Sequence, residues 1–157
     1  NEIFYYRDVE EAIEAEELCT LNHSEHILVE FSPSESFVYI QNAMDSLSGM
    51  GYMPILAHVE RYECMLNNLE NVEHLRTINV EIQVNASSVV GEVGHRVKKY
   101  AHQLIKNRLV DYIATDAHDS KRRPPVMQKC YKILQKQCDS AYVDEITYLN
   151  AEKILDR

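Results

Sequence analysis

Acidic and histidine side chains lie in or directly after several short apolar runs of this sequence. Glu30 interrupts one run, His58 ends another, and Asp116 and His118 follow a third, while Glu2 lies at the start of a further β-rich segment. Carboxylate oxygens and imidazole nitrogens are ligands that Mn²⁺, Fe²⁺ and Zn²⁺ accept. The residue types and their positions therefore predict a metal site that contains Glu30, His58, Asp116 and His118.

Each of these residues also has a purely structural interpretation. The Asp-x-His pattern occurs by chance, and His58 with the charged residues after it could form a strand end with an ion pair on the next turn. Glu30 is harder to explain in this way, because burying an unpaired carboxylate is costly. Either Glu30 is functional, or its strand is exposed on one side.

Two arginines lie close behind these candidate ligands. Arg61 comes three residues after His58, and Arg123 comes seven residues after Asp116. A guanidinium group binds phosphate oxygens in pairs and stabilises charge that develops at phosphorus. The alternative for each arginine is a surface ion pair. The spacing favours a phosphate-binding role for both.

The elements that must position these residues alternate between strands and helices. Apolar β-rich runs predict strands at 2–6, 27–31, 54–58, 80–84 and 112–116. Three- and four-residue apolar spacing predicts helices over 37–47, 66–75, 97–105 and 124–134, and Asn150 could cap a last short helix. Such alternation indicates parallel βα units, whose strands end at one face. Five units are too few to close a barrel, so either the sheet stays open or strands preceding residue 1 are missing.

The composition is that of a globular chain with a substantial core. The 157 residues are 45 % apolar and 26 % charged, and the net charge is −9. No apolar stretch is long enough to span a bilayer, and the acidic balance argues against broad binding to nucleic acid. The four cysteines form no C-x-x-C pair and precede no phosphate-binding loop, so we expect reduced thiols in a cytoplasmic protein and no cysteine nucleophile. His23 and His26 flank a polar turn and are expected to be exposed.

Several ordered motifs together resemble the bacterial protein-tyrosine phosphatases of the PHP (polymerase and histidinol phosphatase) superfamily. Residues 57–62 resemble the family pattern A-H-P-E-R-[YN], and residues 83–88 resemble Q-[IV]-N-A-G-S. Residues 115–125 resemble [AS]-[ST]-D-A-H-N-x-x-x-R-P-P. Residues 27–31 resemble I-L-[IV]-E-F, and residues 1–3 resemble G-N-E-I. The similarity extends over essentially the whole chain. Val59, Ser87 and Asp119 replace the usual Pro, Gly and Asn.

This resemblance implies a fold and a chemistry. The fold is α/β, with parallel βα units forming part of a (β/α)7 barrel-like, TIM-barrel-related structure, and residues 1–157 are one PHP-type phosphatase domain. The implied reaction is hydrolysis of phosphotyrosine by a metal-bridging hydroxide in a multinuclear centre, most commonly with Mn²⁺, although Fe²⁺ or Zn²⁺ would also serve. The implied partner is the phosphotyrosine tail of a bacterial tyrosine kinase that controls capsule or exopolysaccharide synthesis. By matching position, the metal ligands are Glu2, Glu30, His58, Asp116 and His118, and the phosphate is held by Arg61 and Arg123.

One departure from the family pattern is substantial. The opening H-x-H motif has no counterpart in these residues, nor does the later His of a third metal position, and the domain is therefore expected to be incomplete at its N-terminus. Two alternatives stay open: an inactive or binding-only remnant of the domain, and a small-molecule phosphoesterase of the same superfamily.

Overall fold

A computed structural model describes residues 2–6, 9–15, 19–117 and 125–155. Five parallel strands form one sheet in sequence order, and they are β1 (Glu2–Phe4), β2 (His26–Glu30), β3 (Met53–Leu56), β4 (Glu81–Asn85) and β5 (Tyr112–Ala114). This order without reversal is that of a barrel segment. The predicted parallel βα architecture is confirmed, and the five predicted strands all form.

Helices connect the strands and extend beyond the last one. The described helices are α1 (Val9–Glu14), η1 (Leu21–His23), α2 (Phe37–Gly49), η2 (Val59–Arg61), α3 (Leu69–Thr77), α4 (Ala86–Val90), α5 (His95–Lys106), α6 (Met127–Leu134), α7 (Ser140–Asp144), η3 (Glu145–Leu149) and α8 (Asn150–Leu155). Polar caps fix several helix starts. Ser36 accepts a hydrogen bond from the Tyr39 N–H, Asn68 from the Asn71 N–H, and Asp139 from the Tyr142 N–H. The sequence did not predict α1, α4, α7 or the short helices η1, η2 and η3.

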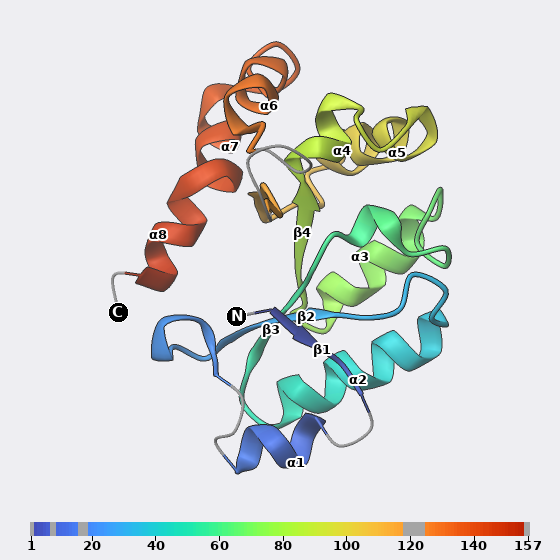
Figure 1. The fold of residues 1–157 in the computed structure, drawn as a ribbon, viewed down its shortest axis with the longest axis vertical. Coiled ribbons are helices and arrows are strands. Elements are labelled where there is room, and N and C mark those ends of the chain that lie inside the picture. Colours follow the sequence, from blue (N-terminus) through green and yellow to red (C-terminus); the bar gives the residue numbers. More distant parts are fainter. Residues whose placement is uncertain (1, 7–8, 16–18, 118–124, 156–157) are drawn as a thin grey trace.

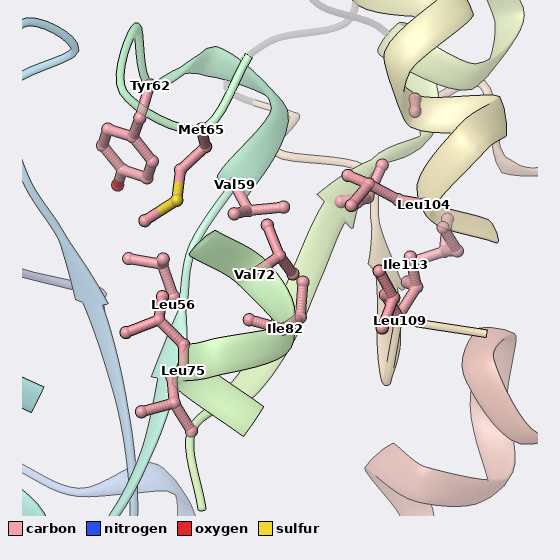
Figure 2. Packing of buried hydrophobic residues seen from close by; sticks show 14 of the residues in the cluster. Leu56, Val59, Tyr62, Met65, Val72, Leu75, Ile82, Leu104, Leu109 and Ile113 are labelled. Atoms are coloured by element: carbon pink, nitrogen blue, oxygen red, sulfur yellow. The ribbon is translucent and has the colours of Figure 1, made fainter. Parts of the chain in front are cut away.

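The main core lies between the sheet and the connecting helices. Alternate strand residues such as Val29, Leu56, Ile82 and Ile113 are buried on this side. Figure 2 shows Leu56 and Ile82 packed with the α3 residues Val72 and Leu75, and Leu104 of α5 near Ile113. This face supplies the hydrophobic stabilisation of the described structure.

The other face of the sheet is turned toward the C-terminal helices. In Figure 1, α8 (red) lies across from the strands, while α2, α3 and α5 lie on the opposite side. Leu28, Ile55 and Gln83 of this inner face and Ile154 of α8 line an apolar cavity of about 290 Å³. Because strand side chains alternate between faces, Glu2, Glu30, Gln83 and Asn85 all belong to the inner face, as the register between strands requires.

Candidate metal centre

Three side chains from consecutive strands converge on the inner face. Glu2 comes from β1, Glu30 is the last residue of β2, and His58 follows β3. The Nε2 atom of His58 lies 3.1 Å from Glu30 Oε2 and 3.4 Å from Glu2 Oε1. One ligand atom from each of the three residues lies within 4.8 Å of the other two. This separation suits joint binding of one cation.

The chemistry of the three groups fits a divalent metal ion. Two carboxylates compete here for one imidazole N–H, which can satisfy only one of them fully. The His58 side chain is only 9 % exposed, whereas Glu2 and Glu30 retain 30 % and 32 % exposure, so the site is partly open. A cation bound among them would satisfy both carboxylates at once. This mixed oxygen and nitrogen donor set suits Mn²⁺, Fe²⁺ or Zn²⁺.

The protonation of His58 reflects the same geometry. Burial works to lower the pKa of His58, but the hydrogen bond and negative charge of Glu2 outweigh it, and the pKa lies above its ordinary value of 6.5. The imidazole therefore binds a proton more tightly than a free imidazole does. A cation would take the place of that proton, so binding of metal releases a proton.

An unusual backbone conformation presents the imidazole. His58 has φ 37° and ψ 50°, which is left-handed and costs about 1–2 kcal/mol for a residue with a side chain. Its N–H donates to the Gln83 Oε1 atom at 2.6 Å, which helps to hold this conformation. The strand predicted to reach His58 therefore ends at Leu56, because the chain turns into η2 instead.

A second pair joins two further predicted site residues. Arg61 Nη1 lies 3.3 Å from Asp116 Oδ2, and the same oxygen accepts a 2.9 Å hydrogen bond from Asn85 Nδ2. The Arg61 Nε atom is buried without a hydrogen-bond partner among the described residues. Asp116 also has a left-handed backbone, with φ 48°. Arg61 is thus held by a carboxylate and retains an unused N–H donor.

Polar side chains of β4 connect the two groups, and the sequence did not assign them this function. Gln83 accepts from the backbone of His58 and donates from Nε2 to Asn85 Oδ1 at 2.7 Å, and Asn85 in turn donates to Asp116. The signal in the sequence was the alternation Glu81-Ile82-Gln83-Val84-Asn85, with a polar residue at every second position of a strand.

Glu60 stabilises the turn between His58 and Arg61 through its buried side chain. Its side chain is fully buried, and its Oε1 accepts hydrogen bonds from the Ser88 hydroxyl at 2.6 Å and from the Asn85 N–H at 3.1 Å. Burial raises the pKa of Glu60, although these two hydrogen bonds and the Arg61 charge oppose the increase. The charged segment after β3 is therefore not a solvent-exposed ion pair.

The other sequence predictions have mixed outcomes. Glu2, Glu30 and His58 are brought together, Arg61 and Asp116 contact each other, and His118 and Arg123 lie outside the described residues. The expectation that His26 is exposed is wrong. His26 is only 6 % exposed and lies 3.6 Å from Glu81 Oε2, because the inner face of the sheet supplies a carboxylate for it.

The chain matches a described protein family along nearly its whole length. The family described as "Capsular polysaccharide synthesis, CpsB/CapC" matches residues 1–156 of this chain. The chain belongs to the CpsB/CapC family. The sequence-based prediction of a capsule-type tyrosine phosphatase relative is confirmed.

Individual CpsB/CapC members resemble the chain along nearly its whole length. "Tyrosine-protein phosphatase CpsB" of Streptococcus pneumoniae is 33 % identical over 159 residues, which cover 98 % of this chain and 65 % of that protein. "Tyrosine-protein phosphatase YwqE" of Bacillus subtilis (strain 168) is 30 % identical over 157 residues, covering 98 % of this chain and 60 % of that protein. The chain thus spans less than two thirds of the length of the curated relatives it matches.

A solved structure confirms the fold class. It is described as belonging to "YwqE from Bacillus subtilis and CpsB from Streptococcus pneumoniae, unique metal-dependent tyrosine phosphatases". It matches this chain with a TM-score of 0.91 and 29 % sequence identity, over 99 % of this chain and 62 % of that one.

No helix in the described part of the chain has the length and apolar character needed to cross a membrane.

Proposed function

We propose that residues 1–157 belong to a single PHP-type domain of a metal-dependent protein-tyrosine phosphatase. The observation that carries the proposal is the convergence of Glu2, Glu30 and His58 within 4.8 Å. The family assignment and the names of its members, CpsB and YwqE, support the reaction class.

In this proposal Glu2, Glu30 and His58 hold a divalent cation, and Asp116 and His118 are further candidate ligands. Mn²⁺ is the proposed metal, with Fe²⁺ and Zn²⁺ as alternatives that the same donors accept. When bound, such a cation lowers the pKa of a coordinated water and polarises a phosphate oxygen.

The residues of the chain bind and orient the phosphate. Arg61 donates to phosphate oxygens and neutralises the charge that develops on them, and Arg123 is proposed to act in the same way. Asp116, fixed by Asn85, positions the Arg61 guanidinium. Gln83 keeps the His58 backbone in place, so the imidazole stays directed toward the two carboxylates.

The proposed substrate is phosphotyrosine on the tail of a bacterial tyrosine kinase that regulates capsule or exopolysaccharide synthesis. The family description supports the link to capsular polysaccharide. The four cysteines form no disulfide, which suits a reducing compartment such as the cytoplasm. The remaining sequence-based alternatives are a binding-only domain and a phosphoesterase for small molecules.

The test combines metal content with turnover. The purified chain is loaded with Mn²⁺, desalted and analysed by mass spectrometry, and phosphate release is measured from a phosphotyrosine peptide and from histidinol phosphate. Glu30→Gln is expected to lose bound metal and turnover, whereas Arg61→Ala keeps metal and loses turnover. Glu63→Gln, a matched change at an exposed site, serves as the control.

Each outcome has a defined meaning. Metal binding with peptide turnover supports the phosphatase, and faster release from histidinol phosphate favours the small-molecule enzyme. Metal binding with phosphopeptide binding but no turnover supports a binding-only domain. Full metal content in Glu30→Gln would contradict the proposed metal site.

A further inference from the structure

Positive charge is concentrated in one part of this acidic protein. Residues 93–110 carry five Lys and Arg and residues 125–138 carry three, from a total of 16 in the chain. Neither segment contains an Asp or Glu, although the whole chain has 25 of them and a net charge of −9. Since like charges repel, such a cluster is a candidate for binding an anionic partner.

The structure brings this charge together in a groove of about 440 Å³ along α5. Three lysines (Lys98, Lys99 and Lys106) and two histidines (His95 and His102) line it, with no carboxylate among its lining residues. Lys99 and Lys106 are exposed, and Lys98 is half-buried and donates to the Val90 carbonyl at 3.2 Å. Within the described residues, none of the three lysines pairs with a carboxylate.

The groove is built on a rigid support. His102 donates from Nε2 to the Val89 carbonyl at 3.0 Å, and its Nδ1 lies 2.7 Å from Gln137 Oε1. These bonds tie α5 to α4 on one side and to the segment after α6 on the other. The lysines therefore extend from a helix whose position is fixed.

One short helix connects the groove to the candidate metal centre: Lys98 donates to the carbonyl of Val90, the last residue of α4. The helix α4 begins directly after Asn85, which bonds Asp116, and α5 packs against η2, which carries Arg61. The five residues of α4 rise about 7.5 Å. An extended peptide covers roughly 3.3 Å per residue, so about two to three residues would span the length of α4.

We propose that this α5 groove binds an acidic segment of the same polypeptide that presents phosphotyrosine to the metal centre. The inference rests on the proposed phosphatase function and adds a second point of contact for the substrate. Its physical basis is the match between several unpaired lysines and a run of carboxylates or phosphates. Such a contact selects substrate proteins by the acidity of the sequence near the phosphotyrosine.

The test measures binding without requiring turnover. Fluorescein-labelled peptides contain one phosphotyrosine and, four residues away on either side, a run of six Glu or six Gln. Fluorescence anisotropy is expected to give about tenfold tighter binding for the Glu peptide. Lys99→Glu and Lys106→Glu should each weaken Glu-peptide binding roughly threefold and leave the Gln peptide unchanged. Lys153→Glu, on exposed α8, makes the same charge change elsewhere and should have no such effect.

Several results would overturn the inference. Equal affinity for the Glu and Gln peptides would show that the groove does not bind acidic residues. An equal loss of Glu-peptide affinity in Lys153→Glu would show that only the net charge of the protein matters. A further arm uses vesicles of phosphatidylglycerol and phosphatidylcholine. If Lys99→Glu weakens vesicle sedimentation but not peptide binding, the groove is a lipid-binding surface and the inference is wrong.

A non-phosphorylated Glu peptide separates this inference from the phosphatase proposal. If it binds as tightly as the phosphorylated one and still depends on Lys99, the groove is supported while recognition of phosphotyrosine fails. If phosphorylation strengthens binding but the Glu run does not, the groove alone is refuted.

Discussion

The backbone N–H of His58 donates a 2.6 Å hydrogen bond to the Oε1 atom of Gln83. One candidate metal ligand is therefore held by a side chain of the neighbouring strand β4. The same Gln83 donates to Asn85, and this extends the support toward Asp116. The position of the imidazole depends on a residue that carries none of the expected chemistry.

Replacing Gln83 by Leu is expected to weaken Mn²⁺ binding about 10- to 100-fold, as for other residues that orient metal ligands. The buried His58 N–H loses its acceptor, and the left-handed turn loses its support. Isothermal titration calorimetry measures the affinity. Gln128→Leu, at an exposed position of α6, is the control. An unchanged Mn²⁺ affinity in Gln83→Leu would contradict the assigned function of Gln83.

Truncation of Glu60 should lower the free energy of unfolding by about 2–4 kcal/mol in Glu60→Ala, because two buried donors lose their acceptor and a cavity forms. Ser88→Ala removes only one donor and should cost about 1 kcal/mol. Urea denaturation compares both with Glu63→Ala at an exposed position, which should stay within about 0.5 kcal/mol of the unmodified chain. A cost for Glu60→Ala no larger than this control would show that the buried carboxylate is not structural.

The stability contributed around Glu81 should depend on pH. Burial raises the pKa of Glu81 above its ordinary value of 4.5, even though Tyr112 donates to it and His26 lies nearby. The folded state therefore binds this proton more tightly than the unfolded state does, and its stabilising effect is lost as pH rises through the folded pKa. Glu81→Gln removes this loss and should gain stability relative to the unmodified chain as pH rises from 4 to 8. Urea denaturation across this range, with Glu145→Gln at an exposed position as the matched control, checks the sign.

Arg61→Lys is expected to lower kcat/KM for a phosphotyrosine peptide about 100-fold while leaving bound metal unchanged. Lysine keeps the charge, but it cannot form the two parallel hydrogen bonds that a guanidinium makes with phosphate. Steady-state kinetics with Arg108→Lys, an exposed arginine, provides the comparison. Rates equal to the control would exclude Arg61 from phosphate binding.

Alkylation of cysteines should not reduce phosphotyrosine hydrolysis. Burial raises the pKa of the Cys130 thiol to about 12, and it also raises the pKa values of Cys64 and Cys138, so little thiolate is present at pH 7. Iodoacetamide treatment of a Cys19→Ser variant, which lacks the exposed thiol, isolates the other three. Loss of activity in parallel with labelling of one thiol would point to a cysteine nucleophile after all.

The sequence predicted the strands well, because apolar β-rich runs are a strong local signal. Glu30 and His58 were predicted as ligands because they lie near the ends of such runs, and Glu2 because residues 1–3 resemble the family pattern G-N-E-I; the structure brings these three side chains together. The helix α1 was not predicted, because its six residues Val9-Glu10-Glu11-Ala12-Ile13-Glu14 contain only one pair of large apolar residues at helical spacing, too short a pattern to indicate a helix.

The supporting residues could not be predicted in the same way. The function of Gln83 depends on which face of β4 points inward, and the contact of His26 with Glu81 joins residues far apart in the sequence. A local pattern contains neither relationship. The polar turn beside His26 suggested exposure, whereas the pairing of strands placed it beside a carboxylate.

The strand that carries Glu2 is three residues long, and within the described part of the chain it pairs with β2. A cation shared by Glu2, Glu30 and His58 would therefore join β1 to β2 and to the residue that follows β3. Anything that binds only the folded form adds RT ln(1 + [L]/Kd) to its stability, about 2.7 kcal/mol at a hundredfold excess over Kd. Attachment of β1 and occupancy of the metal site are then coupled equilibria, and the free cation concentration controls how firmly β1 is held against β2.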